Sequence, residues 1–493
     1  MAGKLEGRHK SNFGLPTILN LILDDDTRTP TTSEAARKPG KPKSSHLVSL
    51  QMNRMQAATS GSFQKLTITN PKRDPKNVSG RATWYPYYAG FSPVFARSFF
   101  DSLALNPGSK VLDPWNGSGT TIEAAAHAGH DAQGFDINPV MIVIARARML
   151  SDSSRQSLEP LSAAILRRVW EVRAPHLERC DPLELWLAPE SAGAFRRLET
   201  GIQQLLVNAD GHRFLNSRAT VAQLSDLAAF YYVALFRTAR SLLQRFFTSN
   251  PTWVKKPAAP ANRARPTIEA VLDAFGREVE SMTAVLQPEW TRSAGGQYTL
   301  AIASSEKLPI EDGSVHAILS SPPYCTRIDY AIATSVELAV LGIDATHGLT
   351  ELRRAMIGSA MVPREAPRTH EDWGKTCLTF LDRVAKHSSK ASATYYLKNH
   401  LQYFDGVFRS LAEISRVLIE KGTCALVVQD SHYKDVHNDL QRIVVEMGEA
   451  NNLQLGRQVD FENTRSMARR HPHARKYWPH PHARESVLMF TRL

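Results

Sequence analysis

The sequence predicts an α/β fold, in which a sheet with helices on both faces is interrupted by a largely helical insert. Two strand patterns, at 111–113 and 315–320, each run directly into a short loop of unusual composition. Between them, from about 151 to 295, the pattern is almost entirely that of amphipathic helices. The chain has 493 residues, of which 42% are hydrophobic, and this is enough to fill a large core.

The composition and these patterns divide the chain into four parts. Residues 1–80 are expected to form a basic, partly flexible segment, because Ser, Thr, Pro, Lys and Arg are abundant from Thr27 to about Gly80. The other three parts are the first part of the sheet at 81–150, the helical insert at 151–295 and the second part of the sheet at 296–493.

The first part of the sheet opens with Val111-Leu-Asp-Pro-Trp-Asn-Gly-Ser-Gly-Thr-Thr121, a strand that runs into a glycine turn and a helix. Gly117 and Gly119 let a bound group approach the backbone where a Cβ would collide. A second strand ends at Gly134-Phe-Asp-Ile-Asn-Pro139. Asp136 therefore stands about twenty residues after the turn, where an acidic side chain can bind the ribose hydroxyls of a nucleoside cofactor. A helix over 140–150 is expected to follow.

The helical insert and the second part of the sheet are predicted from periodicity. In the insert, one apolar stripe consists of Val271, Phe275, Val279, Met282 and Leu286. The α/β pattern then resumes, with strands at 298–303, 315–320, 423–429, 454–461 and 485–491 and a helix over 330–341.

The tetrapeptide Ser321-Pro-Pro-Tyr324 directly follows the strand at 315–320. The hydroxyl of Ser321 and the carbonyl of Pro322 can accept the hydrogens of an amine, and the prolines fix the backbone and remove competing N–H donors. Tyr324 offers an aromatic face on which a base extruded from a duplex can stack. Alone, such a tetrapeptide is more often an ordinary loop or a polyproline ligand, and a glycine turn is common in doubly wound folds.

Together, the two motifs resemble the S-adenosylmethionine-dependent amino-methyltransferases of DNA. The resemblance implies a Rossmann-like methyltransferase sheet, S-adenosyl-L-methionine as cofactor and an exocyclic amine of a flipped base as the methyl acceptor. It makes 151–295 the candidate target-recognition region. Catalytic roles are implied for Ser321, Pro322, Pro323 and Tyr324. Cofactor binding is implied for Asp113, Pro114, Gly117, Ser118, Gly119, Thr120, Asp136, Ile137 and Asn138.

Two further cofactor contacts are expected around this motif. The aromatic segment Trp84–Ser92, which includes Tyr87, looks like the family's helix that covers the cofactor, although a core-packing helix is the equal alternative. After the third strand the family has an Asp that reaches the cofactor adenine, and this sequence has Ser304 there. A serine can still accept one hydrogen bond. Trp115-Asn116 also departs from the family's usual pair.

The net charge of +12 is concentrated in two clusters with interleaved aromatic residues. Such clusters suit contact with nucleic-acid phosphates, although a solvated basic face is the simpler alternative. The first cluster contains Arg237, Arg240, Arg245, Lys255, Lys256, Arg263 and Arg265, and the second contains Arg469, Arg470, Arg475 and Lys476. Two His-x-His pairs lie in the second cluster, but without Cys or carboxylates at ligand spacing we expect no metal site.

The leading hypothesis is a site-specific DNA methyltransferase that acts on double-stranded DNA, at cytosine N4 more than at adenine N6. A base N-methyltransferase of RNA and a non-catalytic nucleic-acid-binding component of a defence system are the alternatives. A cognate restriction endonuclease or a defence-system component is a candidate partner. The four cysteines are scattered without CxxC spacing, which favours a cytoplasmic location, and no membrane association is expected.

Overall fold

The computed structural model describes residues 63–74, 78–87, 90–175, 180–207, 212–248, 253–286, 296–326, 328–463 and 483–493. Within these ranges, no helix combines the length and the apolar character needed to cross a membrane.

A seven-stranded sheet with the order β3-β2-β1-β4-β5-β9-β8 forms the centre of the molecule. All neighbours from β3 to β5 pair in parallel, and β9 pairs antiparallel with both β5 and β8. The predicted Rossmann-like α/β fold is therefore confirmed. The strands are β1 (Lys110–Asp113), β2 (Asp131–Asp136), β3 (Tyr298–Ile302), β4 (Val315–Ser320), β5 (Leu418–Gln429), β8 (Leu453–Asn463) and β9 (Ala483–Arg492).

The strand order reverses between β1 and β4, since the chain first builds outward to β3 and then returns to the other side of β1. In open α/β sheets, ligands bind outside the carboxyl ends of the strands at such a switch point. The glycine turn follows β1 and the proline loop follows β4, so both motifs lie at this place in the fold.

Both faces of the sheet are covered. Consecutive residues of a strand point to opposite faces, and Val111 and Leu112 accordingly belong to different hydrophobic clusters, both fully buried. The cluster that contains Val111 includes residues of α4 (Pro93–Ser102), α5 (Thr120–His127) and α6 (Pro139–Arg148). The cluster that contains Leu112 includes residues of α15 (Gly374–Lys386), α16 (Leu397–Val417) and α17 (Leu440–Glu449).

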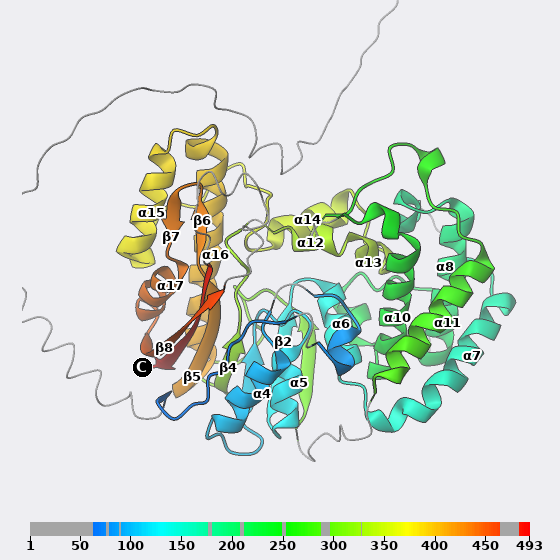
Figure 1. Cartoon of the computed structure of the whole chain (residues 1–493), viewed down its shortest axis with the longest axis horizontal. Helices are drawn as coiled ribbons and strands as arrows, with labels where there is room; N and C mark the ends of the chain where they lie inside the picture. Colours follow the sequence, from blue (N-terminus) through cyan, green and yellow to red (C-terminus); the bar gives the residue numbers. More distant parts are fainter. Residues whose placement is uncertain are drawn as a thin grey trace, which may run out of the picture.

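The described residues between α6 and β3 form helices that extend the first of these clusters to one side of the sheet (Figure 1). The side chains from Phe230 to Phe236 are all fully buried, and Trp84 donates a hydrogen bond to the Met282 carbonyl at 3.0 Å. These helices therefore pack on the sheet's own core. They are α7 (Arg155–Glu171), α8 (Pro189–Leu206), α9 (Arg218–Ala222), α10 (Asp226–Leu242) and α11 (Ile268–Ala284).

The structure differs from the sequence prediction at four places. The described residues of the aromatic segment Trp84–Ser92 are not helical, and the helix α4 begins only at Pro93. Strand β5 begins at Leu418, before the predicted start at Thr423. The expected helix over 330–341 breaks at Thr334 into α12 (Tyr330–Ala333) and α13 (Ser335–Val340). Part of the N-terminal segment is packed, because Phe63 and Leu66 are buried and Arg457 of β8 donates to both of their carbonyls, at 2.7 and 3.0 Å.

The remaining elements are short. They are α14 (His347–Ala355), the hairpin β6 (Ser431–Tyr433) and β7 (Val436–Asn438), the π-helical segment η8 (Ser392–Tyr396), and 3₁₀ turns at Gly80–Thr83, Asp152–Ser154, Pro182–Leu185, Gln244–Phe246, Pro260–Asn262 and Glu371–Trp373.

Candidate active site

The glycine turn between β1 and α5 needs both of its glycines. Gly117 and Gly119 have φ angles of 49° and 82°, a region that other residues rarely adopt. A Cβ on Gly119 would lie 2.7 Å from the Cβ of Ala145, so α5 and α6 could not pack as closely. A Cβ on Gly117 would lie 2.7 Å from the hydroxyl of Tyr87, which therefore rests directly on the turn.

Asp136, at the end of β2, is tied to the glycine turn. One carboxylate oxygen accepts the N–H of Gly117 at 2.9 Å, and the other accepts the N–H of Asn138 at 2.8 Å. Burial raises the pKa of Asp136 to about 6, against the lowering effect of these two bonds. A carboxylate has about four lone-pair positions, so two remain for a ligand's hydroxyl groups.

Asp113, at the end of β1, links the cofactor motif to the proline loop. Its side chain is 2% exposed and accepts hydrogen bonds from the Ser320 hydroxyl and the Trp115 N–H. Thr121 adds a second link, since its hydroxyl donates to the carbonyl of Leu319 at 2.9 Å. Burial raises the pKa of Asp113 to about 6, although the bonds from Ser320 and Trp115 lower it. Both motifs are thus held side by side.

Arg148, which was not predicted from the sequence, holds the glycine turn through Ser118 and Thr120. Its guanidinium donates to the Ser118 carbonyl at 2.8 Å and to the Ser118 hydroxyl at 3.1 Å, and it pairs with buried Glu123. It also reaches the Thr120 hydroxyl at 3.5 Å. The polar atoms of Ser118 therefore face Arg148, and the neighbouring Pro114 is buried. An arginine some thirty residues from the turn gives no local sequence signal for this contact.

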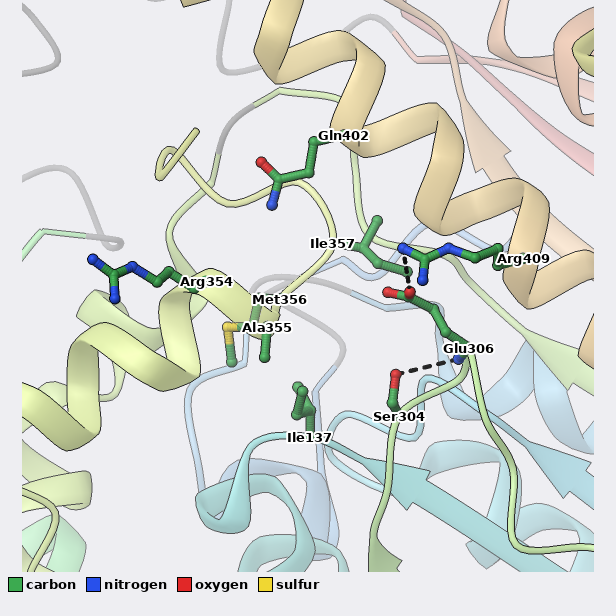
Figure 2. A pocket seen from close by; sticks show the side chains of 9 residues that line it. All are labelled: Ile137, Ser304, Glu306, Arg354, Ala355, Met356, Ile357, Gln402 and Arg409. Carbon is green, nitrogen blue, oxygen red and sulfur yellow. Dashed lines mark hydrogen bonds and ion pairs between the residues drawn. The ribbon is translucent and has the colours of Figure 1, made fainter. Parts of the chain in front are cut away.

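A cavity of about 280 Å³ opens beside the ends of β2 and β3 (Figure 2). Its lining includes Ile137, directly after Asp136, and Ser304, which follows β3. These two predicted cofactor residues therefore meet at one cavity. The complete lining consists of Ile137, Ser304, Glu306, Arg354, Ala355, Met356, Ile357, Gln402 and Arg409.

The polar atoms of this cavity come mainly from residues that the prediction did not name. The hydroxyl of Ser304 accepts the N–H of Glu306 at 3.2 Å. Glu306 pairs with Arg409 at 2.7 Å, and burial raises the pKa of its carboxyl group. Gln402 projects from α16 toward the cavity, and its buried side-chain oxygen has no hydrogen-bond partner within the described residues (Figure 2). Glu306 lies two residues from Ser304 and could be found by sequence, whereas Gln402 could not.

Asn138, another predicted cofactor residue, has a structural use. Its side-chain oxygen accepts the N–H of Val140 and caps α6, and its amide donates to Thr334 at 3.0 Å. This bond joins α6 to the break between α12 and α13. The side chain is 2% exposed, so its contact with a cofactor stays a prediction.

The proline loop has a defined set of hydrogen bonds. The Ser321 hydroxyl donates to the Val427 carbonyl of β5 at 2.9 Å, and the carbonyl of Pro323 accepts from Tyr403 at 2.9 Å. The carbonyl of Pro322 has no hydrogen-bond partner among the residues that the structure describes. Ser321 has donated its one hydroxyl proton, so toward a further partner its oxygen can only accept.

Tyr87 lies where the two motifs meet. Burial raises the pKa of Tyr87 well above its usual range, and the charges of Tyr330, Asp136, Tyr324 and Asp113 add to the shift. These groups lie on the cofactor side and on the proline-loop side, so the Tyr87 hydroxyl is close to both. Tyr324 is half-buried, and its backbone is hydrogen-bonded to Tyr330. The structure thus brings the predicted catalytic and cofactor residues to one place.

The first basic cluster is partly used inside the protein. The guanidinium of Arg240 pairs with fully buried Glu337 at 2.6 Å, and Arg237 pairs with Glu278 at 2.6 Å. Arg245 donates to the Asn262 carbonyl at 2.8 Å. These three arginines therefore have contacts inside the protein, and DNA contact by any of them stays a prediction. Acidic residues distant in the sequence pair with Arg237 and Arg240, and a backbone carbonyl accepts from Arg245.

The other residues of the basic clusters differ in their position. Arg263 lies 3.7 Å from Glu184 in a weak pair, while Lys255, Lys256 and Arg265 are exposed. The second cluster, with Arg469, Arg470, Arg475 and Lys476, lies outside the described residues, as do the His-x-His pairs. DNA contact by either cluster stays a prediction.

Comparison with known proteins places two methyltransferases among the chain's relatives. It is 23% identical over 304 residues to the type II methyltransferase M.BsoBI of Geobacillus stearothermophilus, which covers 59% of this chain and 58% of that protein. It is 22% identical over 317 residues to the type II methyltransferase M.AvaI of Nostoc sp. (strain PCC 7120), which covers 61% of each. The chain thus spans about three fifths of the length of these relatives. No protein-family model matches it.

Among solved structures, the chain is similar to a geranyl diphosphate methyltransferase in complex with GPP and sinefungin. The identity is 8%, the match covers 81% of this chain and 78% of the other, and the TM-score is 0.29. The fold assignment depends on the strand order and pairing described above.

Proposed function

We propose that the protein is a DNA methyltransferase that transfers a methyl group from S-adenosyl-L-methionine to an exocyclic amine of a flipped base. One observation carries this proposal. Beside the glycine turn, the Ser321 oxygen can only accept, because its proton is donated to Val427, and the neighbouring Pro322 carbonyl has no donor among the described residues. We take these two atoms as the pair of acceptors for the amine. The similarity to type II methyltransferases supports the same class of reaction.

The residues present fit S-adenosylmethionine, which supplies an electrophilic methyl group when bound. The two free lone-pair positions of Asp136 suit ribose hydroxyls. The cavity beside Ile137 and Ser304 suits the adenine ring, whose amine could donate to the unpartnered oxygen of Gln402. Asp113 and Tyr87 would then border the methionine end of the cofactor, next to the proline loop.

The acceptor pair has a direct chemical use. An exocyclic amine is a poor nucleophile because its lone pair is delocalised into the ring. Acceptors fixed before the reaction hold both amine hydrogens, so that the lone pair localises and points along the line of transfer. Ser321 and Pro322 would act in this way. The ring of Tyr324 would stack on the base.

The preferred base is cytosine. A serine at the head of the tetrapeptide goes, within the family that it resembles, more with cytosine N4 than with adenine N6. We further propose that the helices at 151–295 read the target sequence and that exposed Lys255, Lys256 and Arg265 bind phosphates.

The proposal is tested by incubating the full chain with radiolabelled S-adenosylmethionine and either unmodified genomic duplex DNA or total RNA. Label in the DNA, lost in the Ser321→Ala variant, is the expected result. Label in RNA alone would replace the DNA substrate by RNA. No label in either, from a folded protein that binds the cofactor, would favour a non-catalytic nucleic-acid-binding component.

A further inference from the structure

Three elements hold the proline loop through hydrogen bonds: α16, β5 and β6. Tyr403 lies in the first third of this long helix and is 1% exposed. Its hydroxyl donates to the Pro323 carbonyl at 2.9 Å, while β5 accepts from Ser321 and the hydroxyl of Ser431 in β6 donates to Cys325 at 3.4 Å. The loop is therefore fixed on both sides of its prolines.

The contact of Tyr403 anchors the proline pair to α16. The ring of Pro323 fixes its own φ angle, so it restrains the peptide unit that carries the Pro322 carbonyl. The next peptide unit, between Pro323 and Tyr324, is not followed by a proline ring, and the Tyr403 hydroxyl holds its carbonyl at 2.9 Å. The bond therefore holds the rigid proline pair in place, and with it the Pro322 carbonyl.

We propose that Tyr403 is a positioning residue for methyl transfer: by holding the Pro323 carbonyl, it keeps the Pro322 carbonyl turned toward the amine of the target base. This inference rests on the proposed function. Tyr403 itself does not contact the base, and it acts only through its hydrogen bond to the proline loop.

The surroundings of Tyr403 suit a permanent donor. Burial raises the pKa of its hydroxyl well above its usual range, so it keeps its proton at every pH at which the enzyme would work. On the other side, the ring packs against Gly358, where an added Cβ would lie 3.5 Å from the ring and 3.3 Å from the Tyr324 carbonyl. The ring is therefore located by packing and the hydroxyl by one hydrogen bond.

Tyr403→Phe tests the inference, and Tyr395→Phe is a matched control. Tyr395 also donates its hydroxyl to a loop carbonyl, that of Ala360 at 2.8 Å, but this carbonyl is outside the tetrapeptide. Three quantities would be measured for both variants. They are the single-turnover rate of methyl transfer to unmodified genomic DNA, the cofactor affinity by calorimetry, and the hydrogen exchange of the peptide that contains 321–330.

We expect Tyr403→Phe to lower the transfer rate by about five- to fifty-fold, to leave the cofactor affinity within about two-fold and to speed exchange in the loop. Tyr395→Phe should change none of these. Equal behaviour of the two variants, or a fall in affinity as large as the fall in rate, would overturn the inference. A wild-type chain that transfers no methyl group would instead refute the proposed function, and the exchange comparison would still show whether Tyr403 holds the loop.

Discussion

We expect the buried carboxyl group of Asp113 to lower the free energy of unfolding at neutral pH. Its carboxyl group is 2% exposed, and its pKa is raised from 3.8 to about 6. A shift of this size means that the ionised group costs the folded state about 3 kcal/mol at neutral pH. In Asp113→Asn, the remaining oxygen can still accept from Ser320 and Trp115, and the new amide faces the Thr121 hydroxyl.

The sign of the pH dependence follows from the raised pKa. The folded state holds the proton up to about pH 6, whereas the unfolded chain releases it near pH 4. Wild-type stability therefore falls as the pH rises from about 4 to about 6. The variant has no such proton. Its advantage in free energy of unfolding should therefore grow by about 2–3 kcal/mol from pH 4 to pH 8, while its transfer rate falls about ten-fold or more.

Denaturant unfolding of both proteins at the two pH values would measure this difference. Asp101→Asn is the control, because Asp101 is exposed on α4. If the stability difference between Asp113→Asn and wild type were the same at both pH values, the raised pKa of Asp113 would be wrong. A variant that kept full activity would remove Asp113 from the site.

Four further changes have defined outcomes. Asp136→Ala should weaken cofactor binding by about 1–3 kcal/mol in calorimetry, since ribose hydroxyls lose a charged acceptor; unchanged affinity in a folded protein would exclude this role. Ser321→Ala should slow single-turnover transfer by about ten- to a thousand-fold with little change in cofactor affinity, and a wild-type rate would reduce Ser321 to a loop residue. Arg240→Met should destabilise the protein by about 3–5 kcal/mol, because buried Glu337 keeps the Tyr85 hydroxyl but loses its charged partner; normal stability with weak DNA binding would instead indicate a phosphate contact. The double variant Lys255→Gln, Lys256→Gln should flatten the salt dependence of DNA binding by about one unit of log–log slope per lost contact, whereas an unchanged slope would indicate a solvated face.

The parts of the fold that sequence predicts are those set by local pattern. The strand at 315–320 was predicted with the observed bounds, and the closing strands with errors of one or two residues at each end. Alternating or continuous apolar residues next to Gly and Pro encode such strands directly. Asp136 was predicted for the same reason, because it stands at the end of a strand, whereas Asp113 and Ser321 were predicted from their places in the two motifs that resemble the methyltransferase family.

The remaining features depend on partners far away in the chain. The pairing of Arg240 with Glu337, 97 residues further on, could not be predicted from the local basic cluster. The break in the helix at Thr334 accompanies a bond to Asn138, almost 200 residues earlier. Gln402 and Tyr403 reach the site from α16, whose sequence reads as an ordinary amphipathic helix. Tertiary packing determines all of these contacts, and no periodicity signals them.

The identity of the methylated nucleoside is the strongest test of the proposed function. Unmodified duplex DNA would be incubated with the full chain and S-adenosylmethionine, digested to nucleosides and separated by mass spectrometry. We expect a methyl group on an exocyclic amine, with N4-methylcytosine as the main product and only a trace from Ser321→Ala. Methylation at a ring carbon or a ring nitrogen would contradict the proposed function, because the acceptors at Ser321 and Pro322 serve an amine, and methylation of RNA alone would contradict the choice of DNA as substrate.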